Sequence, residues 1–391
     1  MSTFRRPDAG ATSSPTIIVN SASGLVSCVP YLVGFTPVDS LVMVFMTSPP
    51  RLVAVTLRID LVRPQQAAAL PEVLDHLGGA LDRSVAFGVD LDVVHLLVFA
   101  ADAADLPAAD MVRGVVALCS DRDVEVSQVL AVHDDHMWHY DCDGVGCCPG
   151  VGHEVEAEEA VRAQFGLVSA GIGYVPDRAA LERSVQADPE HGIDEGDLAA
   201  ARREREEATV AVLSGRRWRR GCEDSLIAAM RGPFDRETAQ RRGATWAVGL
   251  ADARVREPLL YRLLTVGPQS SRPERLGAAR DWLTGLVSML PDGACAPVAA
   301  TLAALVWQQG DGAYARIAAE RALQCDPGNR LATLIHVACG SGIPPKQWLD
   351  VLTSFSLTEL REPAGCGQPV ATGSTALLSR PRRHLDGRAA K

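Results

Sequence analysis

Residues 28–62 constrain the fold more than any other part of the chain. They contain a short, almost wholly apolar run at 41–46, which is typical of a strand buried on both faces. Over residues 51–61 polar and apolar side chains alternate instead. Pro49 and Pro50 lie between the two runs and lack the backbone N–H groups that would continue a strand ladder. The two runs are therefore predicted to pair as a hairpin and to start a sheet.

Helical and strand patterns alternate on either side of this hairpin. The spacing of apolar residues predicts helices at 22–33, 64–81 and 105–119, the second one closed by Gly78 and Gly79. Further strands are expected at 16–19, 93–100 and 124–133. Strands separated by helices of this length form crossover units, whose sheets are mostly parallel and covered on both faces. The fold class predicted is α/β, with an N-terminal three-layer domain and a mixed, largely parallel sheet.

The second half of the chain is helical almost without interruption. The whole chain has 391 residues, which exceeds what one hydrophobic core usually organises, so two domains are expected. The predicted boundaries are a disordered arm at 1–15, the α/β domain at 16–175, a linker at 176–196, an all-α domain at 197–360, and a disordered basic tail at 361–391.

One segment of the helical half, residues 299–329, is similar to a tetratricopeptide hairpin. Gly310 and Asp311 fit its turn, and Ala315 and Ala322 fit positions where two helices approach closely. A second copy at the 34-residue period is not evident, and one repeat alone cannot stack into a groove. The segment is therefore either an ordinary helical hairpin or a peptide-binding element.

Charge and composition restrict the partners of this chain. The net charge of −10 predicts against nucleic-acid binding, which only the four arginines of the run at 216–220 and the basic tail favour. No apolar run is long enough to cross a membrane, and no secretory signal opens the chain. The protein is expected in the cytoplasm, with its ten cysteines reduced. A protein partner bound through the helical domain is the interaction expected.

Several separated motifs occur in the order found in a known family. They are Pro30-Tyr31-Leu32 with Gly34-Phe35, Pro37 and Asp39-Ser40-Leu41-Val42, then residues 57–61, Trp138 with Cys142 and Cys147-Cys148-Pro149, and finally Gly310-Asp311-Gly312-Ala313 with residues 320–323 and Asp326-Pro327. In these motifs the chain resembles the bacterial, actinobacterial-type family called domain of unknown function 4192, over roughly residues 16–345. The resemblance implies no settled activity, so no catalytic residue is carried over from it.

Residues 133–153 hold four histidines and three cysteines. Imidazole and thiolate are the ligands that zinc prefers, and Cys142, Cys147 or Cys148, and His153 are the candidate set. The spacing between the first two cysteines differs from the paired C-x2-C knuckle, and adjacent cysteines rarely reach one metal ion. The alternatives are a Gly/Pro turn packed on the sheet edge and a redox switch that joins Cys142 to either neighbour. We expect no cofactor, with zinc as the alternative.

Asp39, Ser40, Arg58 and Asp60 form the second candidate site. If the hairpin pairs as predicted, these polar side chains gather at one end of the sheet, where open α/β sheets bind ligands. An arginine beside a carboxylate is also what an ordinary structural ion pair looks like. The four residues are therefore either a ligand-binding face or part of the scaffold.

These patterns favour a non-catalytic protein that binds or contacts a partner. The sequence lacks a phosphate-binding G-x-x-x-x-G-K-[ST] loop, an H-E-x-x-H helix and a G-x-S-x-G turn. The alternative is a metal-dependent enzyme, most plausibly a hydrolase, with residues 133–153 or the Asp39–Asp60 face at its centre.

The zinc hypothesis has a direct test. Because the cysteine spacing is poor, we expect protein purified under reducing conditions without added metal to contain far less than one equivalent of zinc by elemental analysis. Chelation should therefore leave the melting temperature unchanged. Removal of a structural zinc ion would lower it strongly, since binding of such an ion typically contributes roughly 10–16 kcal/mol. Stoichiometric zinc that disappears in Cys142→Ser protein would contradict this expectation and favour the metal-dependent enzyme.

Overall fold

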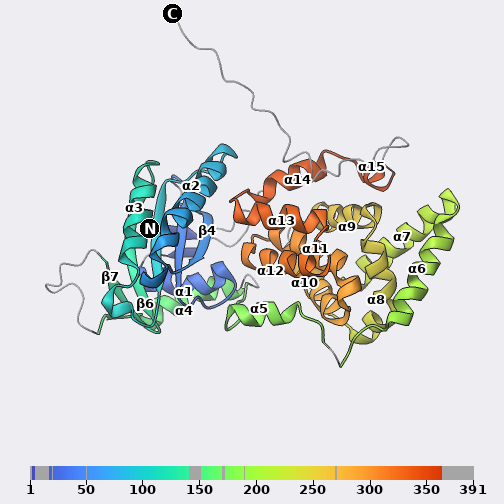
Figure 1. The fold of residues 1–391 in the computed structure, drawn as a ribbon, viewed down its shortest axis with the longest axis horizontal. Helices are drawn as coiled ribbons and strands as arrows, with labels where there is room; N and C mark the ends of the chain where they lie inside the picture. Colours follow the sequence, from blue (N-terminus) through green and yellow to red (C-terminus); the bar gives the residue numbers. More distant parts are fainter. Residues whose placement is uncertain are drawn as a thin grey trace, which may run out of the picture.

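The computed structural model describes residues 2–4, 17–19, 21–49, 51–140, 151–169, 172–188, 190–268 and 271–362. The first part of the chain forms a sheet with helices on both faces, and the rest is helical (Figure 1). The elements of the first part are β1 (Ser2–Phe4), β2 (Ile17–Val19), α1 (Ala22–Val33), β3 (Ser40–Met46), β4 (Val53–Asp60), the 3₁₀ turn η1 (Pro64–Ala69), α2 (Leu70–Ala86), β5 (Val93–Phe99), the 3₁₀ turn η2 (Ala103–Asp105), α3 (Ala109–Ser120), β6 (Glu125–His133), β7 (His136–His139), β8 (His153–Glu154) and α4 (Ala157–Ser169).

The main sheet has six strands in the order β4-β3-β5-β6-β7-β8. Strands β3 and β4 pair antiparallel, with Ser40 opposite Asp60 and Val44 opposite Thr56, so the predicted hairpin is confirmed. Strand β3 is wholly buried, as expected for an apolar run in the middle of a sheet. Strands β1 and β2 form a separate antiparallel pair.

The prediction of a largely parallel sheet is wrong. Among the strands that the structure describes, only β5 and β6 pair parallel, and the other four pairings of the main sheet are antiparallel. Helix α2 does connect two strands that run in the same direction, β4 and β5. However, β3 lies between them and pairs antiparallel with both, so this crossover adds no parallel pairing.

The ends of α1 agree with the local sequence signals, whereas the end of α2 does not. Helix α1 begins after Ser21, whose side chain accepts a hydrogen bond from the Gly24 N–H, and ends at Gly34, which has the left-handed φ of 89°. Helix α2 was expected to end at Gly78 and Gly79, but it continues through both to Ala86. A methyl group at Gly78 would lie 2.8 Å from a guanidinium nitrogen of Arg122, in the turn that follows α3. This glycine therefore provides space for packing, and the helix continues.

The two faces of the sheet pack against different helices. Leu77 and Leu81 of α2 and Met111 and Val115 of α3 form one core with β3, β5 and β6. On the opposite face, α1 and α4 pack over residues such as Val44. This second core is continuous with the core of the helical part.

The helical part packs around a buried central hairpin. Its elements are α5 (Arg178–Ser184), α6 (Glu195–Thr209), α7 (Val212–Ala229), α8 (Arg236–Leu250), α9 (Ala253–Thr265), α10 (Arg272–Met289), α11 (Asp292–Gln308), α12 (Gly312–Cys325), α13 (Arg330–Gly340), α14 (Pro345–Thr353) and α15 (Leu357–Arg361). Helices α11 and α12 pack against each other across a short turn, and α13 packs on both. Likeness to a tetratricopeptide repeat stays a prediction. Helix α5 and the buried Leu181 and Val185 lie in the segment expected to link two domains, whose boundaries also stay a prediction.

A helix that spans a membrane needs about 20 predominantly apolar residues. No helix in the described ranges has the length and hydropathy to span a bilayer.

Helix α2 contacts the loop that follows α13. The hydroxyl of Ser84 donates to the Gly342 carbonyl at 2.8 Å, and Arg83 Nε donates to the Ser341 carbonyl at 3.1 Å. A Cβ at Gly342, which has φ 66°, would lie 2.9 Å from the Ala80 carbonyl oxygen. The sheet part and the helical part therefore meet here with their backbones in close contact.

A second contact joins the end of α1 to the turn between α11 and α12. The carboxylate of Asp311 is buried, accepts a hydrogen bond from the Tyr314 N–H at 3.1 Å, and lies 3.3 Å from Arg280. A methyl group at Gly34 would lie 3.4 Å from Asp311 Oδ1. Gly34 and Asp311 both belong to the motifs on which the family resemblance rests, and they meet in space although 277 positions separate them.

A comparison of two glycines separates the effect of the Asp311 contact on stability from the cost of placing a side chain at a positive φ. Gly34 and Gly88 have similar positive φ values of 89° and 82°, but a methyl group at Gly88 would meet no atom within 4 Å. Gly88→Ala should therefore lose only the conformational term, about 1–2 kcal/mol. Gly34→Ala should lose more, because its methyl group would also lie at the near limit of van der Waals contact with the buried carboxylate of Asp311 and add an apolar group beside that charge. Equal losses in chemical denaturation would show that the Asp311 contact contributes nothing.

Candidate functional site

The polar residues predicted at the end of the sheet do lie together there. Strands β4, β5 and β6 run in one direction, so their carboxyl ends lie at the same end of the sheet, where β3 begins. Ser40 begins β3 and Asp60 ends β4 directly opposite it. The four candidate residues nevertheless divide into two separate sets, one around Arg58 and one around Asp39.

The first set is built on Arg58. Its Nε donates to Ser40 Oγ at 2.8 Å, and its Nη2 lies 2.7 Å from Asp60 Oδ1. The Ser40 hydroxyl donates in turn to the Val38 carbonyl at 2.6 Å. The guanidinium also lies over the Phe35 ring, 5.8 Å from its centre, which is within the range of a cation–π contact.

Arg58 lies in a partly dehydrated environment that holds charges of both signs. Burial lowers its pKa, the neighbouring Asp60 raises it, and the positive charge of Arg178 lowers it. Arg178 belongs to α5, so its charge acts on Arg58 from the helical part. The arginine remains charged at neutral pH, because its ordinary pKa is above 12.

The second set joins Asp39 to residues that the sequence analysis did not identify. Arg63 pairs with Asp39 and, at 3.3 Å, with Asp102, which follows β5. Asp39 has a φ of 45°, in the left-handed region that a turn before the strand requires. Arg63 lies three residues after the end of β4. This position close to the end of the strand was the only feature of the sequence that pointed to Arg63 as a site residue.

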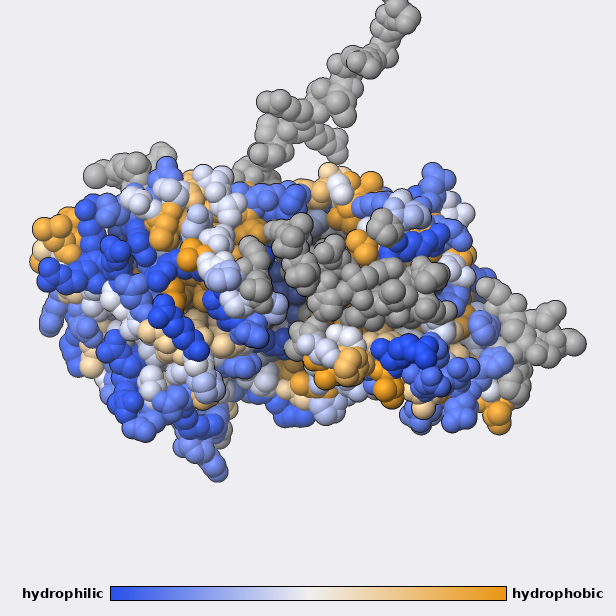
Figure 2. Space-filling view, turned by 180° about the vertical axis from the view of Figure 1, so that it is seen from behind, coloured by the Kyte–Doolittle hydropathy of each residue, from blue (hydrophilic) through white to orange (hydrophobic). Residues whose placement is uncertain are grey.

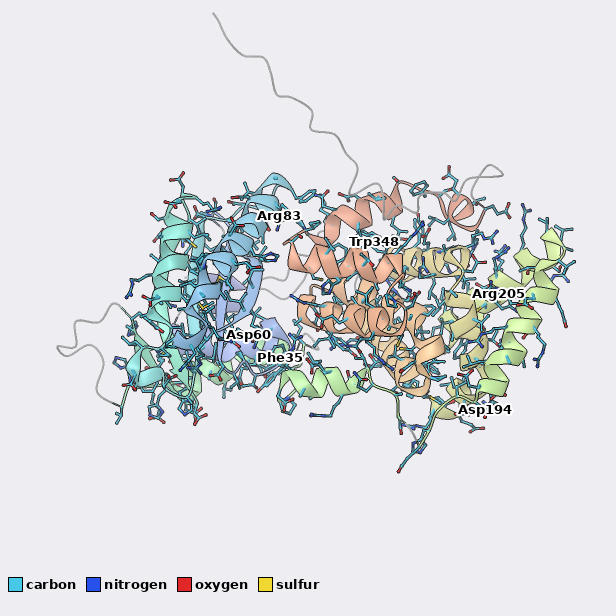
Figure 3. All side chains as sticks on the ribbon, in the orientation of Figure 1. Phe35, Asp60, Arg83, Asp194, Arg205 and Trp348 are labelled. Carbon is cyan, nitrogen blue, oxygen red and sulfur yellow. The ribbon has the colours of Figure 1, made fainter. Side chains whose placement is uncertain are left out.

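Charged side chains of the helical part face the Arg58 set. Arg178 Nε donates to Glu182 Oε1 at 2.8 Å, and its Nη2 lies 3.6 Å from Glu320 Oε2 of α12. Glu320 also accepts from Arg316 at 2.8 Å, and His336 of α13 lies 3.8 Å away. We call these side chains, together with Ser40, Arg58 and Asp60, the junction cluster. In Figure 3, Phe35 and Asp60 lie on the side of the sheet part that faces the helical part.

The helical half of the junction cluster was missed by the sequence analysis. The four-residue spacing between Arg178 and Glu182 and between Arg316 and Glu320 is a visible signal for helical ion pairs. That signal could not show which part of the sheet those pairs would face.

The pairing limits what the junction cluster can do chemically. Arg58, Arg178 and Arg316 each contact a carboxylate, and Asp60, Glu182 and Glu320 each contact an arginine. General acid–base catalysis needs a group free to take or give a proton, and nucleophilic catalysis needs a nucleophile beside a base. Paired arginines and carboxylates suit recognition of charged or backbone groups instead.

Strand β4 adds backbone groups to this site. It is the edge strand of the main sheet and pairs only with β3 among the strands described. Its side chains from Ala54 to Ile59 are half-buried. The unpaired edge therefore offers a row of N–H and C=O groups beside Arg58.

The candidate metal site falls mostly outside the described residues. Cys142, Cys147 and Cys148 lie there, so their arrangement stays a prediction. His153 begins β8, and its ring centre lies 5.8 Å from that of His139 on β7. Within the ranges that the structure describes, no three metal-ligating side chains are grouped.

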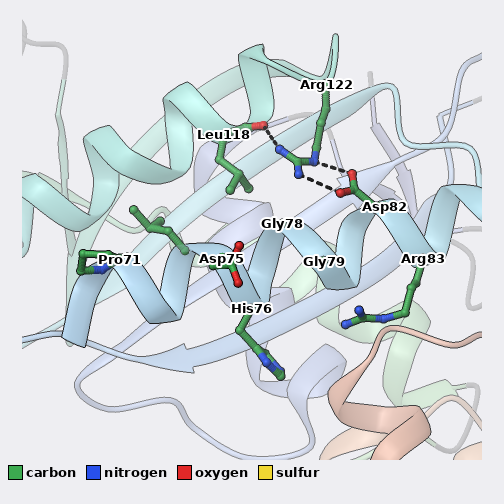
Figure 4. Close-up of a pocket in the computed structure, with 10 residues that line it drawn as sticks. Pro71, Asp75, His76, Gly78, Gly79, Asp82, Arg83, Leu118 and Arg122 are labelled. Atoms are coloured by element: carbon green, nitrogen blue, oxygen red, sulfur yellow. Dashed lines mark hydrogen bonds and ion pairs between the residues drawn. The ribbon is translucent and has the colours of Figure 1, made fainter.

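A depression of about 610 Å³ lies on the outer surface of α2 and α3 (Figure 4). Arg122 crosses it and donates to both oxygens of Asp82, at 2.7 and 3.0 Å. These hydrogen bonds are the main cause of a lowered pKa for Asp82. The charges that line the depression balance each other. The Arg122–Asp82 pair ties the turn after α3 to α2.

His95 lies within strand β5. It is buried, and burial is the main reason that its pKa is lowered to about 4. It is therefore neutral at pH 7. Its Nδ1 has no hydrogen-bond partner in the part of the chain that is described.

Fold and site together define a two-part protein, with a mixed sheet joined to a helical array and paired charges at the junction. The chain belongs to the family described as domain of unknown function (DUF4192), whose sequence model matches residues 23–346. This confirms the family resemblance. No curated protein and no solved structure matches the chain.

The structural role of Arg58 can be measured. Replacement by Met keeps an aliphatic stem over Phe35 but leaves Ser40 and Asp60 without their partner, so it should lower the free energy of unfolding by about 1–3 kcal/mol. Arg113→Met is the matched control, because Arg113 forms an ion pair with Asp110 in which both side chains are more than 70% exposed. It should cost less than about 0.5 kcal/mol. Similar losses in urea denaturation would contradict a buried network at Arg58.

Proposed function

We propose that the protein is a non-catalytic binding protein that holds an extended, acidic polypeptide segment at the junction. The observation that carries the proposal is the unpaired edge of β4 beside two arginines, Arg58 and Arg178, that approach from opposite parts of the molecule. An extended segment added to an edge strand gains backbone hydrogen bonds, and side-chain contacts select its sequence.

The charges favour an acidic segment. Arg178 lowers the pKa of Arg58, which shows that the two positive charges repel each other. A carboxylate placed between them would relieve this repulsion and accept charge-assisted hydrogen bonds from both. Asp60 is 82% exposed and Glu182 48% exposed, so both can move aside for a ligand carboxylate.

The helical part supports the same function in a second way. Glu320 and Arg316 of the junction cluster lie on α12, the second helix of the tetratricopeptide-like hairpin. If this hairpin contacts polypeptides, as the similarity implies, its surface and the edge of β4 would hold one segment from two sides. Location in the cytoplasm and a protein partner are parts of this proposal.

Synthetic peptides test the proposal directly. We expect an eight-residue peptide of alternating Val and Glu to bind the full chain in a fluorescence polarisation assay, and the Val/Lys peptide to bind at least about tenfold more weakly. Arg178→Ala should weaken the Val/Glu peptide by a similar factor. Arg183→Ala is the matched control on the same helix, since Arg183 is 69% exposed and contacts Asp177.

Backbone methylation distinguishes strand addition from simple charge attraction. A peptide N-methylated at every second residue can still pair along one edge but not along the other. We expect one of the two methylation patterns to abolish binding and the other to preserve it. Equal binding of both methylated peptides, or no binding of the Val/Glu peptide, would contradict the proposed function.

A further inference from the structure

Two exposed apolar patches lie far apart along the molecule. The tip patch consists of Val210, Val212 and Leu213, at the turn between α6 and α7, and these side chains are 88%, 71% and 77% exposed. The α4 patch consists of Val161, Phe165 and Val168, which are 64%, 71% and 58% exposed. Helices α6 and α7 form the far end of the helical part, whereas α4 belongs to the sheet part (Figure 1).

The tip patch projects from the body of the protein. Orange side chains mark this end of the molecule in Figure 2, on the outermost surface of the paired helices α6 and α7. Single exposed apolar residues are common on protein surfaces, but contiguous groups mark sites of interaction. A projecting apolar turn fits a complementary surface on another molecule.

The α4 patch is one of two apolar faces on the same helix. Val161, Phe165 and Val168 have the i, i+4, i+7 spacing that places them on one side of α4. Ala163 and Leu167, on the other side, are buried in the core under the sheet. A helix that is apolar on both sides is normally covered on both sides.

The charges around the two patches have opposite signs. Residues 202–220, which include the tip patch and flank it in sequence, contain seven arginines and three glutamates, a net charge of +4 in a chain of net charge −10. Residues 151–169, which include the α4 patch, contain four glutamates and one arginine, a net charge of −3. Arg217 and Arg220 are exposed and form no salt bridge within the described ranges, and Glu154 and Glu156 are exposed as well.

We propose that these patches bind each other between two copies of this chain, with the tip patch of one copy on the α4 patch of the next. Each patch then covers the other, and arginines meet glutamates. Contact between two tip patches would place arginine against arginine, and contact between two α4 patches would place glutamate against glutamate. Like charges at an interface oppose association, so the unlike pairing is favoured.

Other partners fit the tip patch less well. Glu204, Glu206 and Glu207 lie at the end of α6 beside it and would weaken the attraction of the arginines for nucleic-acid phosphates or an anionic lipid surface. Beside the α4 patch, Arg162 pairs with Glu158 and Glu159 of its own helix, at 2.8 and 2.9 Å, and stays 63% exposed. The α4 surface therefore presents both signs of charge, with negative charge in excess.

The pairing joins different surfaces, so it is heterologous. Such contacts build rings where the rotation closes and open chains where it does not. Each patch offers on the order of a few hundred Å² of apolar surface, so the contact belongs with small, transient interfaces. Association should therefore depend on protein concentration and weaken as salt screens the exposed charges.

Two variants and their mixture test the proposal on the full chain. In sedimentation velocity, the average mass of the wild-type protein should rise beyond a dimer with concentration, whereas Leu213→Asp and Phe165→Asp should each raise the apparent dissociation constant at least tenfold. Val85→Asp is the control, since Val85 is 57% exposed on α2 and outside both patches. It should behave as wild type.

The mixture gives the outcome specific to unlike pairing. Leu213→Asp protein keeps its α4 patch and Phe165→Asp protein keeps its tip patch, so together they should form a 1:1 complex that does not grow further. A Phe165→Asp protein that still dimerises alone would show tip-to-tip contact, and a Leu213→Asp protein that dimerises alone would show contact between two α4 patches. Either result, or a wild-type protein that stays monomeric at several hundred micromolar, would overturn the proposal.

Discussion

The buried carboxylate of Asp311 is the interaction on which the relation between the two parts depends. A buried charge is costly unless it is paired and hydrogen-bonded, and Asp311 meets this requirement with Arg280 and the Tyr314 N–H. The same carboxylate lies against Gly34, where a side chain would meet it. One residue therefore begins α12, holds α10 through Arg280 and determines how closely α1 approaches.

This constraint extends from Gly34 to the junction cluster. The Gly34 carbonyl accepts a hydrogen bond from the Val175 N–H at 3.0 Å, and Phe35 forms a β-bridge with Val175. Phe35 follows the end of α1 by two residues, and Val175 precedes the start of α5 by three. Phe35 in turn supports the guanidinium of Arg58. The short segment Gly34–Phe35 therefore lies beside Asp311, supports Arg58, and is hydrogen-bonded to the backbone just before α5.

Local features of this fold were predictable because their causes are local. Ser21 and Gly34 bound α1, and the apolar run at β3 formed a buried strand, as their side chains and conformational preferences predict. The direction of the strand pairings was not predictable in this way, because it depends on β3 lying between β4 and β5. Gly78 shows the same limit, since its local signal for a helix end is overridden by the packing of Arg122, 44 residues away.

The candidate site was half predictable for the same reason. Ser40, Arg58 and Asp60 come together through a hairpin that local sequence specifies, whereas Arg178, Glu320 and His336 reach them only through packing of distant helices. The two partners of the Arg58–Asp60 ion pair differ in exposure, since the Arg58 side chain is 17% exposed and that of Asp60 is 82% exposed. A partly buried arginine with an exposed carboxylate partner keeps its position when that partner is replaced, because Ser40 and Phe35 still hold it. Arg58 is therefore held in place independently of Asp60, which is what the proposed recognition of an acidic segment requires.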